Sequence, residues 1–160
     1  MIRRLRPVSA PAPEYPAQDD LFSGTLENRL GELRERIEKQ WEISVETQIT
    51  GTVGDWPEPV AEQVFRLVQE AVVNAARHAD GSIIRVDVTG TREGIRLVVE
   101  DDGKGYPFHG SFDLPALAAM KRGPLTLRER VAALRGGLQL ETYATGTRVV
   151  ITLNTAFAAD

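Results

Sequence analysis

The chain has no cysteine among its 160 residues. This absence excludes disulfide bonds, zinc sites built on thiolates, iron–sulfur clusters and cysteine nucleophiles. Histidine is also scarce, since His78 and His109 are the only two. A histidine-rich metal site is therefore not expected, and any metal ion would have to bind through oxygen or imidazole.

Long apolar runs are missing as well. Charged residues interrupt every apolar stretch before the roughly 18 residues that a membrane-spanning helix needs, and the N-terminal residues do not resemble a signal peptide. The 19 Lys and Arg residues face 23 Asp and Glu residues, for a net charge of -4. Without a broad basic field, neither nucleic acid nor direct membrane contact is expected. We predict a cytoplasmic location, as a separate protein or as the cytoplasmic part of a larger, membrane-anchored protein.

The overall composition is that of one globular domain, with 42% hydrophobic and 26% charged residues. Residues 1–20 contain several prolines and little apolar surface, which predicts a flexible linker or arm. We expect the domain to span residues 21–155 and a short tail to follow at 156–160.

The first regular pattern is a stripe of apolar residues at helical spacing, which favours packing on a core, with a dimer helix as the alternative. The stripe consists of Leu26, Leu30, Leu33, Ile37 and Trp41.

Alternation of apolar and polar residues predicts a strand over 43–49, closed by a turn at 51–54. A helix is predicted from Glu58 to about Ala79, followed by a hairpin of strands at 82–89 and 95–101. Residues 102–123 show little periodicity and predict a long functional loop. Thr126 and Glu129 stand in capping-box register for a last helix, and strands at 138–143 and 147–153 close the chain. This order predicts an α+β fold with helices on one face of a mixed, mostly antiparallel sheet.

Three polar residues of the predicted helix after Pro57 share one ridge beside its apolar face: Glu70, Asn74 and Arg77. A carboxylate and an amide oxygen one turn apart can hold a hydrated Mg²⁺ together with phosphate oxygens. The alternative is a solvated or salt-bridged ridge. His78 falls inside the apolar arc, which favours a core histidine over a catalytic one.

Asp101 ends a strand on the same face as the apolar Ile95, Leu97 and Val99, so its carboxylate needs a donor. One interpretation is a turn in which Asp101 accepts from the backbone of Gly103. The other is recognition of a ligand's amino group, such as that of adenine, with the following glycines allowing close approach. No P-loop, dinucleotide-binding glycine motif or nucleophile elbow is present in the sequence.

Taken together, Gln69–Ala79 and Asp101–Tyr106 resemble the N box and the Asp-x-Gly-x-Gly box of the histidine-kinase-like ATPases. The segment Leu127–Gly137, followed by Gly146-Thr147, further resembles the sensor kinases that pair with NarL-type response regulators. The likeness spans about residues 21–153, and Leu5-Arg6-Pro7 resembles the segment that joins the dimerisation helices to the ATP-binding domain in that group.

The resemblance implies a Bergerat-type two-layer α/β sandwich that binds ATP and Mg²⁺ under a flexible lid. By matching positions it assigns the metal to Asn74, polarisation of the nucleophile to Glu70 and proximity to the phosphates to Arg77. The further matches are Asp101 as acceptor of the adenine amine, Gly103 and Gly105 as pocket wall, Gly123 facing the phosphates, and Thr147 near the base.

The sequence departs from this family pattern in two ways. The second glycine box reads Lys121-Arg122-Gly123-Pro124, so one glycine is missing. No helix carries the His-Asp or His-Glu pair of a phosphoacceptor. The expected function is therefore that of the catalytic domain of a sensor histidine kinase, which phosphorylates a separate dimerisation and phosphoacceptor domain and acts on a response regulator indirectly. The alternatives are an anti-sigma-factor-type serine kinase and a non-catalytic module that binds nucleotide or a partner protein.

Overall fold

The computed structural model describes residues 25–51, 56–78 and 80–154. The arm predicted at 1–20, the turn residues 52–54 and the tail at 156–160 lie outside this part of the chain. In chain order, the elements are α3 (Leu26–Trp41), β1 (Ser44–Gly51), α4 (Glu58–His78), β2 (Ile83–Gly90), β3 (Ile95–Asp101), β4 (Gly110–Asp113), α5 (Leu114–Met120), α6 (Leu125–Ala133), β5 (Gly137–Tyr143) and β6 (Gly146–Leu153).

The strands form one six-stranded sheet in the order β1-β2-β3-β6-β5-β4. β1 and β2 pair in parallel, and α4 connects them; the other neighbours are antiparallel. The predicted mixed, mostly antiparallel sheet is confirmed. Its central strands, β3 and β6, are separated in sequence by the whole segment from β4 to β5.

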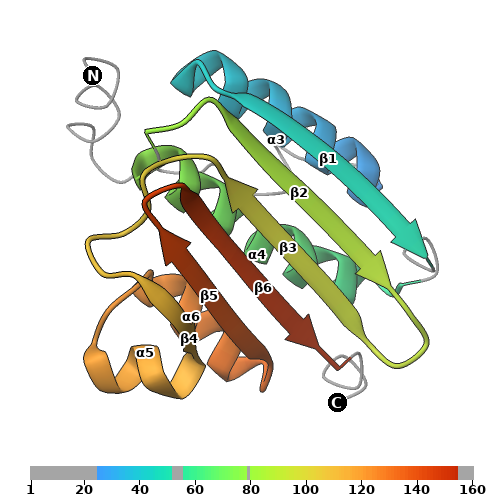
Figure 1. The fold of residues 1–160 in the computed structure, drawn as a ribbon. Coiled ribbons are helices and arrows are strands. Elements are labelled where there is room, and N and C mark those ends of the chain that lie inside the picture. The colour runs from blue at the N-terminus through green and yellow to red at the C-terminus, as the bar shows by residue number, and fades with distance from the viewer. Residues whose placement is uncertain (1–24, 52–55, 79, 155–160) are drawn as a thin grey trace.

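The helices cover one face of this sheet (Figure 1). α3 packs on β1 and α4, α4 packs on β2 and β3, and α6 packs on β5 and α4. The core lies between the two layers, as the sequence predicts. Its largest fully buried side chains include Phe65 of α4, Ile84 of β2, Leu97 of β3 and Leu140 of β5.

All five residues of the first apolar stripe, in α3, are buried within this chain. The helix begins where the Thr25 hydroxyl accepts a hydrogen bond from the Asn28 N–H at 3.2 Å. It ends at Glu42, which adopts a left-handed conformation with φ 57°. The stripe therefore packs on the core of its own domain.

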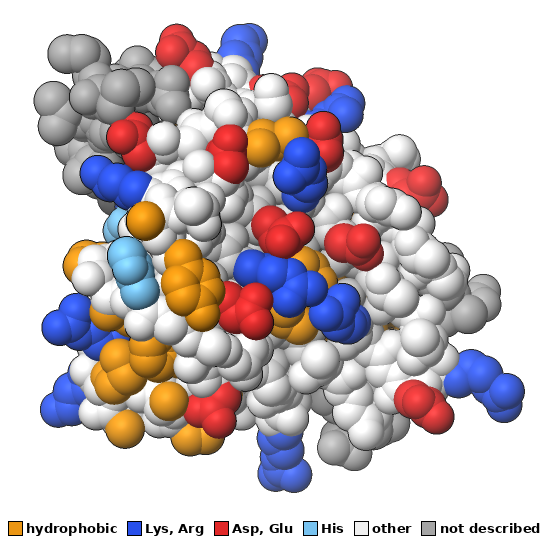
Figure 2. All heavy atoms as spheres, in the orientation of Figure 1, with side chains coloured by type: hydrophobic (Ala, Val, Ile, Leu, Met, Phe, Trp, Pro, Cys, Tyr) orange, Lys and Arg blue, Asp and Glu red, His pale blue; other side chains and the backbone are white. Residues whose placement is uncertain are grey.

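The opposite face of the sheet is polar, and Figure 2 shows acidic and basic side chains gathered across it. Arg148 lies between Glu100 and Glu141, at 3.4 and 3.6 Å, and Arg85 pairs with Glu46 at 3.2 Å. Paired charges of both signs suit a face in contact with water.

The prediction of an irregular loop over 102–123 is wrong in its second half. Residues 110–113 form β4, which pairs with β5, and residues 114–120 form α5. The Asp113 carboxylate caps α5 by accepting from the Ala116 N–H at 2.9 Å, and Pro115 occupies the first turn. Only Leu117 of α5 is buried, so a sequence with a single core residue gives no apolar period to recognise.

The predicted capping box of α6 is also wrong. The helix begins at Leu125 with Pro124 as its N-cap, and no side chain caps it. Thr126 and Glu129 therefore lie inside the helix. Leu127 and Val131 are the residues of α6 that face the core.

Candidate functional site

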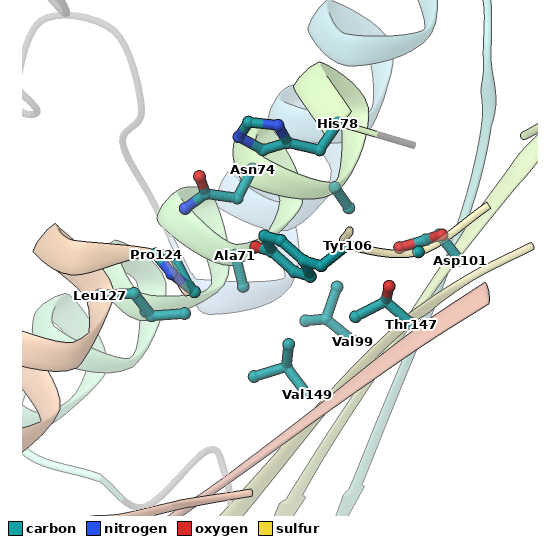
Figure 3. A pocket seen from close by; sticks show the side chains of 12 residues that line it. Ala71, Asn74, His78, Val99, Asp101, Tyr106, Pro124, Leu127, Thr147 and Val149 are labelled. Carbon is teal, nitrogen blue, oxygen red and sulfur yellow. The ribbon is translucent and has the colours of Figure 1, made fainter. Parts of the chain in front are cut away.

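A pocket lies between α4, the segment after β3, the start of α6 and the inner faces of β3 and β6 (Figure 3). Its wall is mostly apolar with a few polar groups, which is the usual make-up of a small-molecule site. The lining residues are Ala71, Asn74, Ala75, His78, Val99, Asp101, Gly105, Tyr106, Pro124, Leu127, Thr147 and Val149.

Asp101 and Thr147 stand opposite each other at the ends of β3 and β6. The Asp101 Oδ1 accepts from the Gly103 N–H at 2.9 Å, which is the predicted turn, and the same residue lines the pocket. Both interpretations of Asp101 therefore agree with the geometry. The turn orients the carboxylate at the place where a ligand's amino group would need an acceptor.

The two glycines after Asp101 have different surroundings. Gly105 lines the pocket with φ 79°, and a Cβ there would collide with the carbonyl oxygen of Tyr143. Gly103 is buried and does not line the pocket; its contribution is the N–H that binds Asp101. Glycine is thus required at 105 by backbone conformation and by the close approach of β5.

Tyr106 extends into the middle of the pocket in Figure 3, although no sequence pattern predicts it as a site residue. Its ring centroid lies 5.7 Å from that of His78 and 5.4 Å from that of Phe108. Burial, together with the negative charge of Asp101, raises the pKa of its hydroxyl to about 12. The only sequence signal for its role is its position directly after the glycine box.

The expectation that His78 lies in the core is wrong. It is exposed at the last residue of α4 and lines the pocket mouth. The apolar arc of a helix is buried only as far as the sheet covers it, and at its C-terminal end α4 extends beyond this cover.

In this conformation the pocket is nearly closed. Its cavity volume is about 20 Å³, enough for about one water molecule. A larger hollow of about 400 Å³ adjoins it and shares His78, Gly105 and Tyr106 as wall residues. Because Tyr106 stands between the two spaces, a ligand of nucleotide size requires its ring to move.

The polar ridge of α4 is partly brought to the pocket. Asn74 lines it, whereas Glu70 and Arg77 do not. The Glu70 carboxylate accepts from the Arg130 Nε of α6 at 2.8 Å, which agrees with the salt-bridged interpretation. The Asn74 Nδ2 donates to the Glu70 carbonyl oxygen at 3.0 Å. Arg77 is half-buried in the last turn of α4.

The Asn74 amide has a suitable group for a hard cation. Its nitrogen is used by the Glu70 carbonyl, so its oxygen is the atom left to act as a ligand. Among the described residues, no three His, Asp or Glu side chains gather as a metal centre would need. A Mg²⁺ here would therefore take most of its ligands from phosphate oxygens and water, as this ion usually does.

The altered glycine box forms the connection between α5 and α6. Lys121 has φ 55° and Gly123 has φ 85°, so the lysine adopts a backbone conformation that glycine favours. Pro124 lines the pocket, whereas Gly123 lies beside it, next to Leu117. The start of α6 is thereby brought to the pocket, where its backbone N–H groups can attract an anion.

Asp102, for which no sequence pattern predicts a role, anchors the start of β2. Its Oδ1 accepts from the N–H groups of Ser82 and Ile83 at 2.8 and 3.0 Å, and its Oδ2 accepts from the Ser82 hydroxyl at 2.7 Å. Desolvation raises the pKa of this carboxyl, but the hydrogen bonds outweigh it and hold the pKa below its ordinary value.

Comparison with known protein families finds a match, over residues 60–156, to the family described as "Histidine kinase-, DNA gyrase B-, and HSP90-like ATPase". Among curated relatives, the chain is 32% identical to the signal transduction histidine-protein kinase/phosphatase DegS of Brevibacillus brevis, over 73% of this chain and 29% of the relative. It is 30% identical to the sensor histidine kinase LnrJ of Bacillus subtilis, over 74% of this chain and 27% of the relative. The chain thus spans less than a third of the length of these relatives.

Among solved structures, the histidine kinase domain of the blue-light activated histidine kinase EL346 from Erythrobacter litoralis superposes with a TM-score of 0.64 at 22% sequence identity. The likeness covers 89% of this chain and 72% of that domain. It supports the two-layer fold. Within the described residues, no helix is both long and apolar enough to cross a bilayer.

Proposed function

The chain belongs to the family of histidine kinase-, DNA gyrase B- and HSP90-like ATPases, and on this premise we propose that it is the catalytic domain of a sensor histidine kinase. It transfers the γ-phosphoryl group of Mg·ATP to a histidine of a separate dimerisation and phosphoacceptor domain. Family membership supports ATP binding, and the names of the curated relatives support the kinase activity.

The observation that carries this proposal is the convergence of Asn74, Asp101, Gly105 and Thr147 on one pocket. They come from α4, from the end of β3 and the turn after it, and from β6, so only the folded domain brings them together. An amide oxygen for the metal and a carboxylate for an amino group lie at the same apolar pocket. This combination suits a nucleotide, which has a flat base and a charged tail.

In this proposal, Asp101 accepts a hydrogen bond from the adenine amine and Thr147 lies beside the base. Gly105 allows close approach of the nucleotide to the backbone. Asn74 provides one ligand of Mg²⁺, and this ion would neutralise phosphate charge when bound. The start of α6 after Gly123 faces the phosphates. Arg77 would add a positive charge near them from the end of α4.

Glu70 acts on the acceptor histidine. One imidazole nitrogen forms the N–P bond as the bond from the γ-phosphorus to the ADP oxygen breaks, and ADP keeps that electron pair. The proton on the other imidazole nitrogen passes to the Glu70 carboxylate. Positioning and charge neutralisation supply most of the rate in such a reaction, and a well-placed base adds about 10²- to 10⁴-fold.

The test supplies a sensor-kinase dimerisation domain, which carries the acceptor histidine, together with Mg·ATP labelled at the γ-phosphate. We expect the parent chain to label this domain. Glu70→Gln should lower the rate about 10²- to 10⁴-fold without weakening ATP binding. Asn74→Ala should weaken the Mg²⁺-dependent part of ATP binding. A folded Glu70→Gln protein that transfers phosphate at the parental rate would remove Glu70 from the mechanism.

The chemical stability of the label separates the two kinase alternatives. Phosphohistidine is lost in acid, whereas the phosphoserine expected from an anti-sigma-factor-type kinase survives it. A non-catalytic role is favoured by one observation, the glycine missing from the box Lys121-Arg122-Gly123-Pro124. Binding of ATP without transfer to any supplied acceptor would support that role.

A further inference from the structure

The pair formed by Glu70 and Arg130 joins two helices that both contribute to the pocket wall. Glu70 lies on α4, one turn before the pocket residue Asn74. Arg130 lies on α6, one turn after Leu127, which lines the pocket from the other side. The hydrogen bond from the Arg130 Nε to the Glu70 Oε2 is 2.8 Å long and links residues 60 positions apart.

The pair is better shielded than the ion pair that lies wholly within α4, Glu62 with Arg66. The side chains of Glu70 and Arg130 are 20% and 31% exposed, compared with 41% and 34% for Glu62 and Arg66 on the same helix. A partly buried pair with good geometry restricts its side chains more strongly than a surface pair does. The carboxylate of Glu70 therefore has a fixed direction before any ligand arrives.

The hydrogen bonds that the described residues make with Glu70 leave one of its carboxylate oxygens unused. Arg130 uses Oε2 of the carboxylate, and Asn74 uses the main-chain carbonyl oxygen of Glu70. Within the described part of the chain, the Glu70 Oε1 accepts no hydrogen bond. This oxygen can accept a proton while the other stays bound to the guanidinium.

We infer that Arg130 is a positioning residue for phosphoryl transfer, acting through Glu70. It holds the carboxylate by Oε2 so that Oε1 faces the acceptor imidazole, and it makes this orientation depend on the place of α6. This inference rests on the function proposed above. Pro124, the N-cap of α6, and Leu127 of α6 also line the pocket. A nucleotide that fixes the position of α6 therefore also fixes the direction of the Glu70 carboxylate.

The experiment compares the parent with Arg130→Ala, Arg130→Lys, Glu70→Gln and the double variant Glu70→Gln/Arg130→Ala. Arg66→Ala is the matched control, because it breaks another ion pair of α4 away from the pocket. The first readout is the rate of phosphate transfer from Mg·ATP to the supplied dimerisation domain at saturating ATP. The second is the dissociation constant of ATP.

We expect Arg130→Ala to lower the transfer rate at least about tenfold while the dissociation constant changes less than about threefold. Arg130→Lys should restore part of the rate, because lysine keeps a donor and the charge but loses the planar geometry. The double variant should transfer no more slowly than Glu70→Gln alone, because the arginine acts only through this carboxylate. Arg66→Ala should keep the parental rate.

A readout without nucleotide checks the contact itself. In urea unfolding of the same variants, the double-variant cycle should show that the effects of Glu70→Gln and Arg130→Ala on stability are not additive. Additive effects would mean that the two side chains do not interact, and the inference would be wrong.

The outcomes separate this inference from the proposed function. If the parent and Arg130→Ala transfer phosphate equally fast, the inference fails and the proposed function stands. If Arg130→Ala slows the Glu70→Gln protein as much as it slows the parent, the arginine acts elsewhere and the inference also fails. A parent chain that binds ATP but transfers no phosphate overturns the proposed function and this inference with it.

Discussion

Two neighbouring aspartates at the end of β3 perform separate tasks. Asp101 lines the pocket and holds the turn to Gly103, whereas Asp102 turns away and binds the backbone at the start of β2. Successive side chains of a strand point to opposite sides, so an acidic pair at a strand end can serve both the ligand and the fold. Replacing either one should therefore give a different defect.

We expect Asp102→Ala to lower the free energy of unfolding by about 1 to 2 kcal/mol, because it removes a charged acceptor of several hydrogen bonds at an exposed position. Asp102→Asn should lose less, since it keeps one acceptor oxygen for the backbone N–H groups. Urea unfolding at neutral pH measures both changes.

The contribution of Asp102 to the stability of the folded state depends on pH. A carboxyl whose pKa is lowered by folding stabilises the folded state above its ordinary pKa of 3.8 and ceases to do so as the pH falls through the lower, folded value. The advantage of the parent over Asp102→Ala should therefore shrink below about pH 4. An advantage that stays constant down to about pH 2 would contradict the hydrogen-bond account.

Tyr106 should make the protein sensitive to alkali. Its pKa of about 12 lies above the ordinary value of 10.0, so between these values the unfolded chain releases the proton while the folded chain keeps it. Stability must therefore fall as the pH rises from 10.0 towards 12. Between about pH 9 and about pH 11.5, the parent should lose about 2 kcal/mol more than Tyr106→Phe, as measured by urea unfolding. Other groups titrate alike in both proteins, and equal losses would show that the hydroxyl is not buried.

At the scale of residues, the sequence predicts the pocket wall in part. Asn74 of the N box, Asp101 and Gly105 of the glycine box, and Thr147 all line the pocket, and the roles that the resemblance assigns to them stay predictions. The sequence could not predict that Tyr106 fills the pocket or that Arg130 binds Glu70, because both contacts depend on how α6 and the turn after β3 approach α4. His78 was misjudged for the same reason, since periodicity does not say where the covering sheet ends.

At the scale of elements, the segment between β3 and α6 combines two kinds of structure. Residues 102–109 have no helix or strand, whereas β4 and α5 form a packed unit around Phe112 and Leu117. This unit is attached to the sheet through β5. We therefore expect any movement of a lid to be concentrated in residues 102–109 and in the connection around Lys121 and Gly123.

Limited digestion with trypsin tests this expectation. Cleavage after Lys104, Lys121 and Arg122 should be fast in the free protein and slower with saturating Mg·ATP, because ordering over the phosphates withdraws these sites. Arg92, exposed in the turn between β2 and β3, is an internal control whose cleavage should not change. Equal rates at the lid sites with and without nucleotide would argue against a lid that orders on binding.

Element types were predicted well wherever one face is buried, as in α3, α4 and the two hairpins. The prediction failed for β4 and α5, because these elements contribute few residues to the core. Leu117 is the one buried residue of α5, so the packing that stabilises it comes from the rest of the fold. The local signals for α5 are the capping aspartate and the proline in its first turn.

At the scale of the whole molecule, binding of nucleotide and folding are coupled. The pocket wall takes residues from α4, β3, α6 and β6, so a ligand that binds there holds both layers together. Any ligand that binds only the folded state stabilises it in proportion to the logarithm of its concentration over the dissociation constant. Thermal unfolding thus reports on the site without requiring catalysis.

At a concentration one hundred times the dissociation constant, Mg·ATP should add about 2.7 kcal/mol of stability, which corresponds to an increase of about 5 to 10 °C in Tm. Asp101→Asn should remain folded, since its amide oxygen can still accept from Gly103. It should weaken binding by about 1.5 to 3 kcal/mol and reduce the increase to about half or less at the same ATP concentration. A full increase in this variant would remove Asp101 from base recognition.

The pairing of Asp101 with Thr147 has a consequence for how the lid can vary in length. These two residues face each other across β3 and β6, so the register of these two strands sets the spacing between them. The hydrogen bonds between β3 and β6 hold this register directly. The entropy of closing a flexible loop grows only with the logarithm of its length, and doubling the length costs about 0.6 kcal/mol more. Residues can therefore be inserted beside the exposed Lys121 with little loss of stability, while the spacing of the two residues proposed to contact the base stays fixed.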